Sequence, residues 1–286
     1  MFGFVILLIL SSTGFLNGQL SLSSLPCRTI SKAINPNNRP LRIIGGSDAT
    51  RGSFPFIASL TRRGGHYCAA HCICNGLGDI MPANRIKAVL GLHKVSEWKS
   101  DTTNDENSID HRPYEVSIQN AVVHPDYDCK RPDNDIALLR MSQPIEFSAS
   151  VQPMCIASNR MNGNTTYESA SVTIAGWGNV KEELNIGNRA DTLQKANVKV
   201  WNNQECQTSF EQQRKDRKIN PTQMCAGKKV GGIDACWADS GGPMIFDNHL
   251  IGIVSTGIGC ARVGLPGIYT RVSSYTDWIE NVILSN

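Results

Sequence analysis

The chain has 286 residues, a formal net charge of +3 and a hydrophobic content of 41%. These values allow a substantial buried core, and the small net charge argues against a nucleic-acid partner. Its 25 glycines and 13 prolines favour many turns over long helices, and its ten cysteines lack the repeated Cys-x-x-Cys pairs of a zinc ribbon. We therefore expect disulfides formed in an oxidising compartment, with no metal and no cofactor.

The N-terminal residues have the pattern of a signal peptide. Residues 2–10 are apolar, uncharged and too few to span a bilayer, and small and polar residues follow up to Gly18. We predict a signal peptide over 1–18, with a buried N-terminal strand as the alternative. Residues 19–42 are polar and contain one cysteine, which favours a short prosegment. The later sequence has no membrane-crossing run, so we expect a secreted, extracellular protein without a membrane partner.

Downstream of residue 42, short β-branched runs separated by turn residues predict an all-β sandwich or barrel. The C-terminal segment differs, because apolar residues recur there at helical spacing from Tyr275 to Ile283, with Ser273 or Ser274 available as N-cap. The acidic stretch 97–110 predicts an exposed loop, and Asn164-Thr165-Thr166 fits a glycosylation acceptor. The expected strands cover residues 86–90, 121–123, 136–139, 172–175, 196–200, 250–254 and 267–272.

Ser240 is the strongest candidate for a nucleophile, because it stands between Asp239 and two glycines. A serine hydroxyl needs an imidazole to take its proton and a carboxylate to orient that imidazole. His71 has small neighbours in Ala-Ala-His-Cys, and Asp135 opens an apolar run in which a buried carboxylate would need a partner. Taken singly, a histidine such as His71 is usually structural, and an aspartate before a strand such as Asp135 is usually a turn residue or cap.

Four segments occur in the order Arg42-Ile43-Ile44-Gly45-Gly46, Ala-Ala-His71-Cys, Asn-Asp135-Ile-Ala-Leu-Leu and Asp239-Ser240-Gly-Gly-Pro. In this respect the chain resembles the trypsin-like serine proteases of the chymotrypsin fold over residues 43–286. The resemblance implies two packed antiparallel six-stranded β-barrels, a C-terminal helix and an active site in the cleft between the barrels. It further implies that Ser240 is the nucleophile, His71 the general base and Asp135 the orienting carboxylate.

The same resemblance implies a preference for basic residues. Asp234 matches the floor of the primary specificity pocket, and Ser255, Gly257 and Gly267 match its walls. The backbone N–H groups of Ala238 and Ser240 would form the oxyanion hole. We therefore expect protein substrates with Arg or Lys before the cleaved bond, and protease inhibitors as further partners.

Arg42-Ile43 resembles the activation site of a zymogen. Cleavage there by a trypsin-like protease would free an α-ammonium group at Ile43 that could pair with Asp239. The resemblance also implies the disulfides Cys206–Cys225, Cys236–Cys260, Cys27–Cys155 and Cys68–Cys72, which leaves Cys74 to pair with Cys129 by elimination.

The chain departs from the family pattern at three places. The hairpin that relatives carry between Cys68 and the His71 motif is absent, which predicts an incomplete first barrel. Ala238 replaces a glycine, Thr256 replaces the tryptophan usual beside the substrate backbone, and Trp237 introduces a bulky ring near the entrance of the specificity pocket. The preferred function is a secreted serine endopeptidase zymogen. The alternatives are a catalytically impaired homologue that binds partners in a proteolytic cascade, and a non-productive isoform that does not fold stably.

Overall fold

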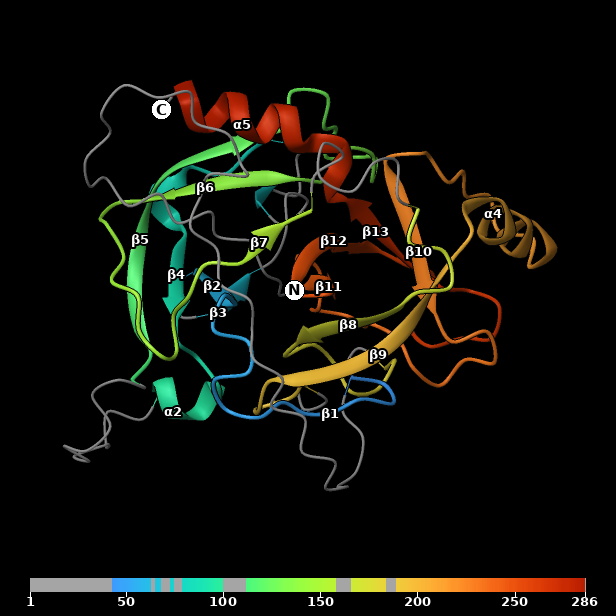
Figure 1. Cartoon of the computed structure of the whole chain (residues 1–286), viewed down its shortest axis with the longest axis horizontal. Coiled ribbons are helices and arrows are strands. Elements are labelled where there is room, and N and C mark those ends of the chain that lie inside the picture. Colours follow the sequence, from blue (N-terminus) through green and yellow to red (C-terminus); the bar gives the residue numbers. More distant parts are fainter. Residues whose placement is uncertain are drawn as a thin grey trace.

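A computed structural model describes residues 43–62, 65–67, 73–74, 79–99, 112–157, 166–183 and 189–285. The predicted signal peptide and prosegment (1–42), His71, the glycosylation acceptor Asn164 and most of the acidic stretch 97–110 lie outside these residues. The described part consists mainly of two β-sheets, with few helices (Figure 1).

The C-terminal half is a closed antiparallel barrel. Six strands follow one another in the order β9-β10-β13-β12-β11-β8, and pairing of β8 with β9 closes the ring. Their bounds are β8 Ser171–Gly176, β9 Gln194–Trp201, β10 Gln223–Gly227, β11 Pro243–Phe246, β12 His249–Thr256 and β13 Gly267–Arg271. Alternation of apolar side chains along these strands fills the interior, where Met224, Met244 and Tyr269 are fully buried. The short strands β1 (Ser47–Asp48) and β7 (Cys155–Ile156) pair with β9 and β12.

The N-terminal half is a five-stranded antiparallel sheet in the order β3-β2-β4-β5-β6. Its strands are β2 Ala58–Arg62, β3 Gly65–Tyr67, β4 Lys87–Leu90, β5 Tyr114–Val123 and β6 Ala137–Met141. Within the described residues no strand pairing joins β3 to β6, so this sheet is open, in agreement with the prediction of an incomplete first barrel. Leu60, Ile86 and Val116 nevertheless form a buried core with their neighbours.

Within the described residues, helices form only short segments. These include the 3₁₀ turns η2 (Ala83–Arg85) and η5 (Val272–Tyr275) and the α-helices α2 (Val95–Lys99), α4 (Asn203–Gln212) and α5 (Thr276–Ser285). Helix α2 overlaps the first residues of the stretch 97–110, which we predicted to be an exposed loop, so that prediction is wrong for residues 97–99. Ser273 and Ser274, the predicted N-caps of the C-terminal helix, instead lie within η5, because a 3₁₀ turn precedes α5. None of the helices among the described residues combines the length and apolarity that a membrane span requires.

Helix α5 lies across both halves of the molecule, alongside β6 (Figure 1). Its Ile279 belongs to a buried apolar cluster that also contains Ile136, directly before β6, and Leu250 and Ile253 of β12. Burial of this apolar surface stabilises the contact between the two sheets. The cluster therefore fixes the segment that carries Asp135 against the strand that ends beside Ser255.

Three disulfides lie within the described residues. They join Cys74 to Cys129, Cys206 to Cys225 and Cys236 to Cys260, with Cα–Cα distances of 6.0, 6.3 and 5.1 Å. These are pairs that we expected from the sequence, including the Cys74–Cys129 pair assigned by elimination. The predicted pairs Cys27–Cys155 and Cys68–Cys72 depend on cysteines outside the described residues.

Candidate active site

The loop that carries Ser240 is fixed to the barrel by backbone hydrogen bonds. Gly241 N–H donates to the carbonyl of Val254 over 2.6 Å, and Val254 N–H donates to the carbonyl of Gly242 over 2.9 Å. A tight turn, closed by Asp239 N–H and the carbonyl of Cys236 at 3.0 Å, precedes Ser240. The Cys236–Cys260 disulfide ties the same loop to a second one. Ser240 is thereby held, half-buried, beside the end of β12.

Asp135 is only 1% exposed and is held by side chains of the opposite barrel. The hydroxyl of Ser255 donates to its Oδ2 over 2.7 Å, and the hydroxyl of Thr270 donates to its backbone carbonyl over 2.9 Å. Ser255 directly follows Val254, the residue bonded to the Ser240 loop. The structure therefore brings two of the three predicted catalytic residues to one short segment of β12, whereas His71 lies outside the described residues.

Ser255 has a role that the sequence analysis did not predict. We had assigned it only to the wall of the specificity pocket, but its hydroxyl is the hydrogen-bond donor to Asp135. The two residues are separated by 120 positions. No local sequence pattern reports such a contact, so only the family resemblance could have suggested it.

Asp234 provides a buried carboxylate with an unsatisfied oxygen. The residue is 3% exposed, and its Oδ2 accepts a hydrogen bond from Ala261 N–H over 3.2 Å. Its Oδ1 has no hydrogen-bond partner and lies beside Gly267, where a Cβ atom would come within 2.8 Å of it. The buried hydroxyl of Tyr269 borders the same position and is also without a partner. Burial raises the pKa of the Asp234 carboxyl to about 7.

Two glycines leave space around this carboxylate. A Cβ at Gly257 would meet nothing closer than the carbonyl oxygen of Gly259 at 3.5 Å, so the backbone there is open on that side. At Gly267 a side chain would collide with the carboxylate itself. A buried carboxylate next to an unpartnered hydroxyl is the kind of arrangement that a hydrogen-bonding cation would satisfy.

Asp239 is a second buried carboxylate, 1% exposed, and it accepts only backbone hydrogen bonds within the described residues. Gly178 N–H donates to Oδ1 over 2.8 Å and Cys236 N–H donates to Oδ2 over 3.0 Å. A Cβ at Gly178 would lie 2.4 Å from the carboxyl carbon, so this close approach requires glycine. Burial raises the pKa of the Asp239 carboxyl to about 6, although both N–H groups act to lower it.

The first described residues pack against the chain that leads to the Ser240 loop. Ile43 is 1% exposed, and Ile44 forms an antiparallel bridge with Asp234 in which Asp234 N–H donates to the Ile44 carbonyl over 3.2 Å. Ile43 has a positive φ of 71°, which is strained for a β-branched residue. Arg42, the residue before the predicted cleavage point, lies outside the described residues.

Ala238 adopts the left-handed backbone region that glycine would occupy without strain, with φ of 78°. Its N–H and that of Ser240 make no hydrogen bond within the described part of the chain. The preceding residue, Trp237, is 40% exposed but is held by hydrogen bonds. The indole N–H of Trp237 donates to the carbonyl of Glu182 over 2.8 Å, and Asn179 N–H donates to the backbone carbonyl of Trp237 over 2.7 Å.

Glu182 connects three loops around the site. In addition to its carbonyl contact with Trp237, its Oε1 accepts from Cys260 N–H over 3.2 Å and from Arg262 Nε over 2.6 Å. Gly259 makes room for this carboxylate, because a Cβ there would lie 2.1 Å from Oε1. Hydrogen bonds of Glu182 thus connect the segments around residues 182, 237 and 260.

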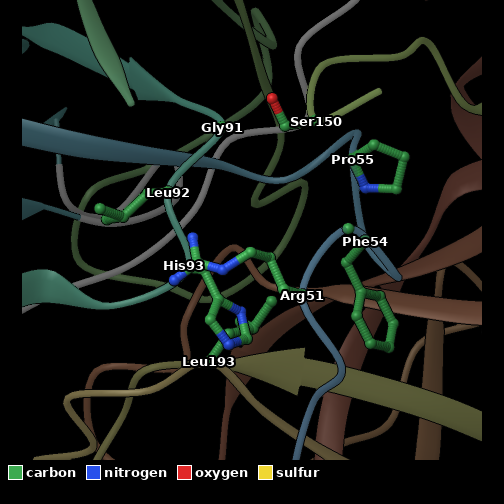
Figure 2. A pocket seen from close by; sticks show the side chains of 9 residues that line it. Arg51, Phe54, Pro55, Gly91, Leu92, His93, Ser150 and Leu193 are labelled. Atoms are coloured by element: carbon green, nitrogen blue, oxygen red, sulfur yellow. The ribbon is translucent and has the colours of Figure 1, made fainter. Parts of the chain in front are cut away.

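A separate small cavity lies away from these residues, and Figure 2 shows the side chains of Arg51, Phe54, His93 and Leu193 around it. Its volume of about 10 Å³ is enough for roughly one water molecule. It contains none of the predicted site residues.

Across the described residues, no group of three or more His, Cys, Asp or Glu side chains is arranged to hold a metal ion. Glu97, from the acidic stretch, instead forms an ion pair with Arg51 at 2.5 Å.

Comparison with known proteins identifies the class. The family model described as Trypsin matches residues 43–279. The chain is 34% identical over 242 residues to "Trypsin II-P29" of Gallus gallus, covering 85% of this chain and 89% of that protein. It is 32% identical over 244 residues to "Venom serine protease Bi-VSP" of Bombus ignitus, covering 82% and 67%.

A third relative is much longer. The "Suppressor of tumorigenicity 14 protein homolog" of Bos taurus is 32% identical over 262 residues, which are 85% of this chain but 28% of that protein. The chain belongs to the trypsin family of serine proteases, which are endopeptidases acting on protein substrates. The closed barrel, the second sheet and the C-terminal helix agree with that fold.

Proposed function

We propose that this chain is the zymogen of a secreted serine endopeptidase that cleaves after Arg or Lys. In this proposal residues 1–18 are a signal peptide, 19–42 a prosegment and 43–286 the peptidase domain. The observation that carries the specificity is the unpartnered, buried Oδ1 of Asp234 beside Gly267. A guanidinium or ammonium group bound there would supply the missing donor and the missing counter-charge.

The chemistry would follow the Ser-His-Asp mechanism that is characteristic of this family. The hydroxyl of Ser240 attacks the scissile carbonyl while His71 takes its proton, and His71 then passes that proton to the leaving amine. Water subsequently hydrolyses the acyl-enzyme by the reverse proton transfers. The fixed, buried position of Asp135 supports its role in orienting His71 and stabilising the imidazolium form.

The oxyanion would be bound by the backbone N–H groups of Ala238 and Ser240, which have no partner among the described residues. Unpaired donors fixed in advance stabilise the charge that develops in the transition state. The positive φ of Ala238 supports this assignment, because it is the backbone conformation that a glycine would readily adopt at this position.

Activation would require cleavage between Arg42 and Ile43 by a trypsin-like protease. The new α-ammonium group would pair with Asp239, whose carboxylate is buried with backbone N–H partners and no cation among the described residues. Such a pair would stabilise the turn that directs Ser240. Because an α-amino group titrates near pH 8 and pairing raises that value, activity should fall in the alkaline range.

The three described disulfides support an extracellular location, as does the predicted signal peptide. Asn164 would then be available for glycosylation. Natural partners would include protein substrates with Arg or Lys at the cleaved bond, the activating protease and protease inhibitors.

The decisive experiment is active-site titration before and after cleavage at Arg42. The secreted chain would be treated with a serine-directed fluorophosphonate and assayed on peptide amides ending in Arg, Lys, Gln or Phe. Labelling and hydrolysis of Arg and Lys substrates should appear only after cleavage. Ser240→Ala should abolish labelling, and Arg42→Gln should remain unlabelled. Folded, correctly cleaved protein that does not react would contradict the proposal.

One observation favours the rival function of an impaired homologue. Ala238 holds a strained conformation, which costs roughly 1–2 kcal/mol relative to an unstrained residue. If this strain displaced the N–H donor, the protein would bind substrates but turn them over poorly. Tight binding of an Arg-ended peptide without fluorophosphonate labelling would identify that function.

A further inference from the structure

Arg217 is a half-buried cation close to the candidate active site. It lies in the segment between α4 and β10 (Figure 1), and its Nη2 donates to the hydroxyl of Thr256 over 3.3 Å. Thr256 is the last residue of β12, adjacent to Ser255, whose hydroxyl holds Asp135. The positive charge of Arg217 is therefore bound to Thr256, the residue that directly follows the hydrogen-bond donor to Asp135.

The guanidinium of Arg217 is poorly satisfied. It offers five N–H donors, and within the described residues only the contact with Thr256 uses one of them. Asp133 is the carboxylate that interacts with it electrostatically, but the Oδ1 of Asp133 accepts a hydrogen bond from Asn220 at 2.5 Å. No carboxylate of the described residues forms an ion pair with Arg217. A partly desolvated cation in this state gains from an anionic partner.

The segment that carries Arg217 is anchored at its far end. Ile219 N–H donates to the side chain of Gln207 over 2.8 Å, and Asn220 N–H donates to the side chain of Gln223 over 3.0 Å. These contacts connect the segment to α4 and to β10. Arg217 is thus presented from a fixed stretch, which lowers the entropy lost when it binds a ligand.

The edge of β12 next to Arg217 is suited to an extended peptide. Its one side pairs with β13 up to Thr256, opposite Ile268. On the other side β11 and the Ser240 loop occupy the strand as far as Val254, and the described residues provide no strand partner beyond that point. A peptide whose scissile bond lies at Ser240 can add to this free edge by backbone hydrogen bonds. Its preceding residues would then run past Thr256.

We propose that Arg217 and Thr256 form an anion-binding subsite that selects an acidic side chain shortly before the cleaved basic residue. The proposal rests on the proposed function for the placement of the substrate. The preferred substrate would therefore carry two opposite charges, a basic one for Asp234 and an acidic one for Arg217. The carboxylate would accept from the free N–H groups of Arg217 and, with the Thr256 hydroxyl turned toward it, from that group.

The test uses equilibrium binding, so that it does not depend on turnover. Full-length Ser240→Ala protein, with the Arg42–Ile43 bond cleaved, would be titrated with fluorescent peptides that end in Arg. The peptides would differ only in Glu against Gln, or Asp against Asn, at each of the three positions before Arg. At one position the acidic peptide should bind roughly tenfold more tightly at low salt, and added salt should reduce the ratio.

Arg217→Gln should remove this preference, whereas Lys218→Gln is the matched control. Lys218 is the exposed neighbour, so its replacement makes the same change in charge without altering the contact with Thr256. Arg217→Glu should reverse the preference toward Lys at the same position. Equal affinity for acidic and amide peptides, or a preference that survives Arg217→Gln, would overturn the proposal.

The outcomes separate this inference from the proposed function. Binding of Arg-ended but not Gly-ended peptides, with no acidic preference, would leave the proposed specificity intact and reject the Arg217 subsite. If the Ser240→Ala protein shows an Arg217-dependent preference but the cleaved protein with Ser240 intact does not hydrolyse peptides, the subsite is kept and the peptidase is rejected. Failure of every peptide to bind would reject both.

Discussion

The hydroxyl of Ser255 donates a hydrogen bond to Oδ2 of Asp135 over 2.7 Å, and it connects β12 of the closed barrel to the loop that leads into β6 of the other sheet. Both residues are at most 3% exposed. A buried carboxylate depends on such donors, because water does not reach it. The contact therefore contributes both to the fold and to the position of the group that would orient His71.

Ser255→Ala should consequently destabilise the protein and lower its activity. Loss of one hydrogen bond to a buried carboxylate costs about 1–3 kcal/mol. Denaturant unfolding should detect this loss, and kcat should fall more than KM rises because the side chain faces Asp135. Ser255→Thr, which keeps a hydroxyl, is the control for stability. Unchanged unfolding free energy in Ser255→Ala would mean that the contact is not made in solution.

The buried Asp239 predicts a pH dependence of stability in the uncut chain. Its folded-state pKa of about 6 lies above the ordinary value of 3.8. The group therefore contributes stability that is present at low pH and is lost as the pH rises through about 6. The difference between pH 5 and pH 8 should amount to about 1.4 kcal/mol from this group.

This difference is measured by urea unfolding of the Arg42→Gln precursor with and without Asp239→Asn. The double variant removes the titrating carboxyl, so its stability should change less between the two pH values. Asp234 titrates in both proteins and cancels from the comparison. Identical pH profiles would contradict the assignment of a raised pKa to Asp239.

Asp234 predicts how the binding of a cation depends on pH. Burial raises its pKa to about 7, so the carboxyl is largely protonated below that value. Benzamidine, an aromatic amidinium, should therefore bind roughly 30-fold more weakly at pH 5.5 than at pH 8. Calorimetry in two buffers at pH 6.5 should detect a proton released on binding. Asp234→Asn should lose most of the affinity and this pH dependence, whereas equal affinities at both pH values would exclude a raised pKa.

Glu182 predicts a role for loop coupling in activity. Glu182→Gln would weaken its contact with Arg262 and keep the carbonyl contact with Trp237. Because the carboxylate is partly exposed, the effect on stability should be small, below about 1 kcal/mol. The KM for Arg substrates should rise, since Cys260 and Ala261 adjoin Asp234. Arg131→Gln, which removes an exposed ion pair elsewhere, is the matched control. An unchanged KM would show that the three loops are positioned without this contact.

The sequence predicted what depends on local pattern. Every β-branched run that we expected to form a strand overlaps one, and four of the six barrel strands, β8, β9, β12 and β13, come from such runs. Strands β10 and β11 were not predicted. Helix α4 was missed because its surface is mostly polar. A signal was present, however, since Asn202 caps the helix through Gln204 and Glu205 N–H, and the spacing of Asn202 and Glu205 is that of a capping box.

The contacts across the site could not be read from local pattern. Ser255 and Asp135 are 120 positions apart, and Arg217 and Thr256 are 39 apart. The apolar cluster around α5 packs the Asp135 segment on β12, and the strand order β10-β13-β12 brings the Arg217 segment near the end of β12. Neither contact follows from spacing along one strand or helix. The order of the motifs predicted Asp135 and Ser240 because this order is typical of one fold family. Arg217 belongs to no motif, so only the structure revealed its position.

Ala238 provides the most direct test of how this chain differs from its relatives. Its φ of 78° costs roughly 1–2 kcal/mol for alanine and nothing comparable for glycine. Loss of an oxyanion donor would cost more, about 2.7–4 kcal/mol in the transition state. The protein should therefore tolerate the strain and keep the donor, with catalysis weakened but not abolished.

Ala238→Gly should then raise kcat several-fold while KM for Arg substrates changes little, because the oxyanion forms only in the transition state. Active-site titration must normalise the rates, since the variant could also change the fraction of folded protein. Ala235→Gly, which alters a residue of the same loop that has no positive φ, is the matched control. If kcat per titrated site is the same with alanine and glycine at position 238, the backbone strain at this residue does not weaken catalysis.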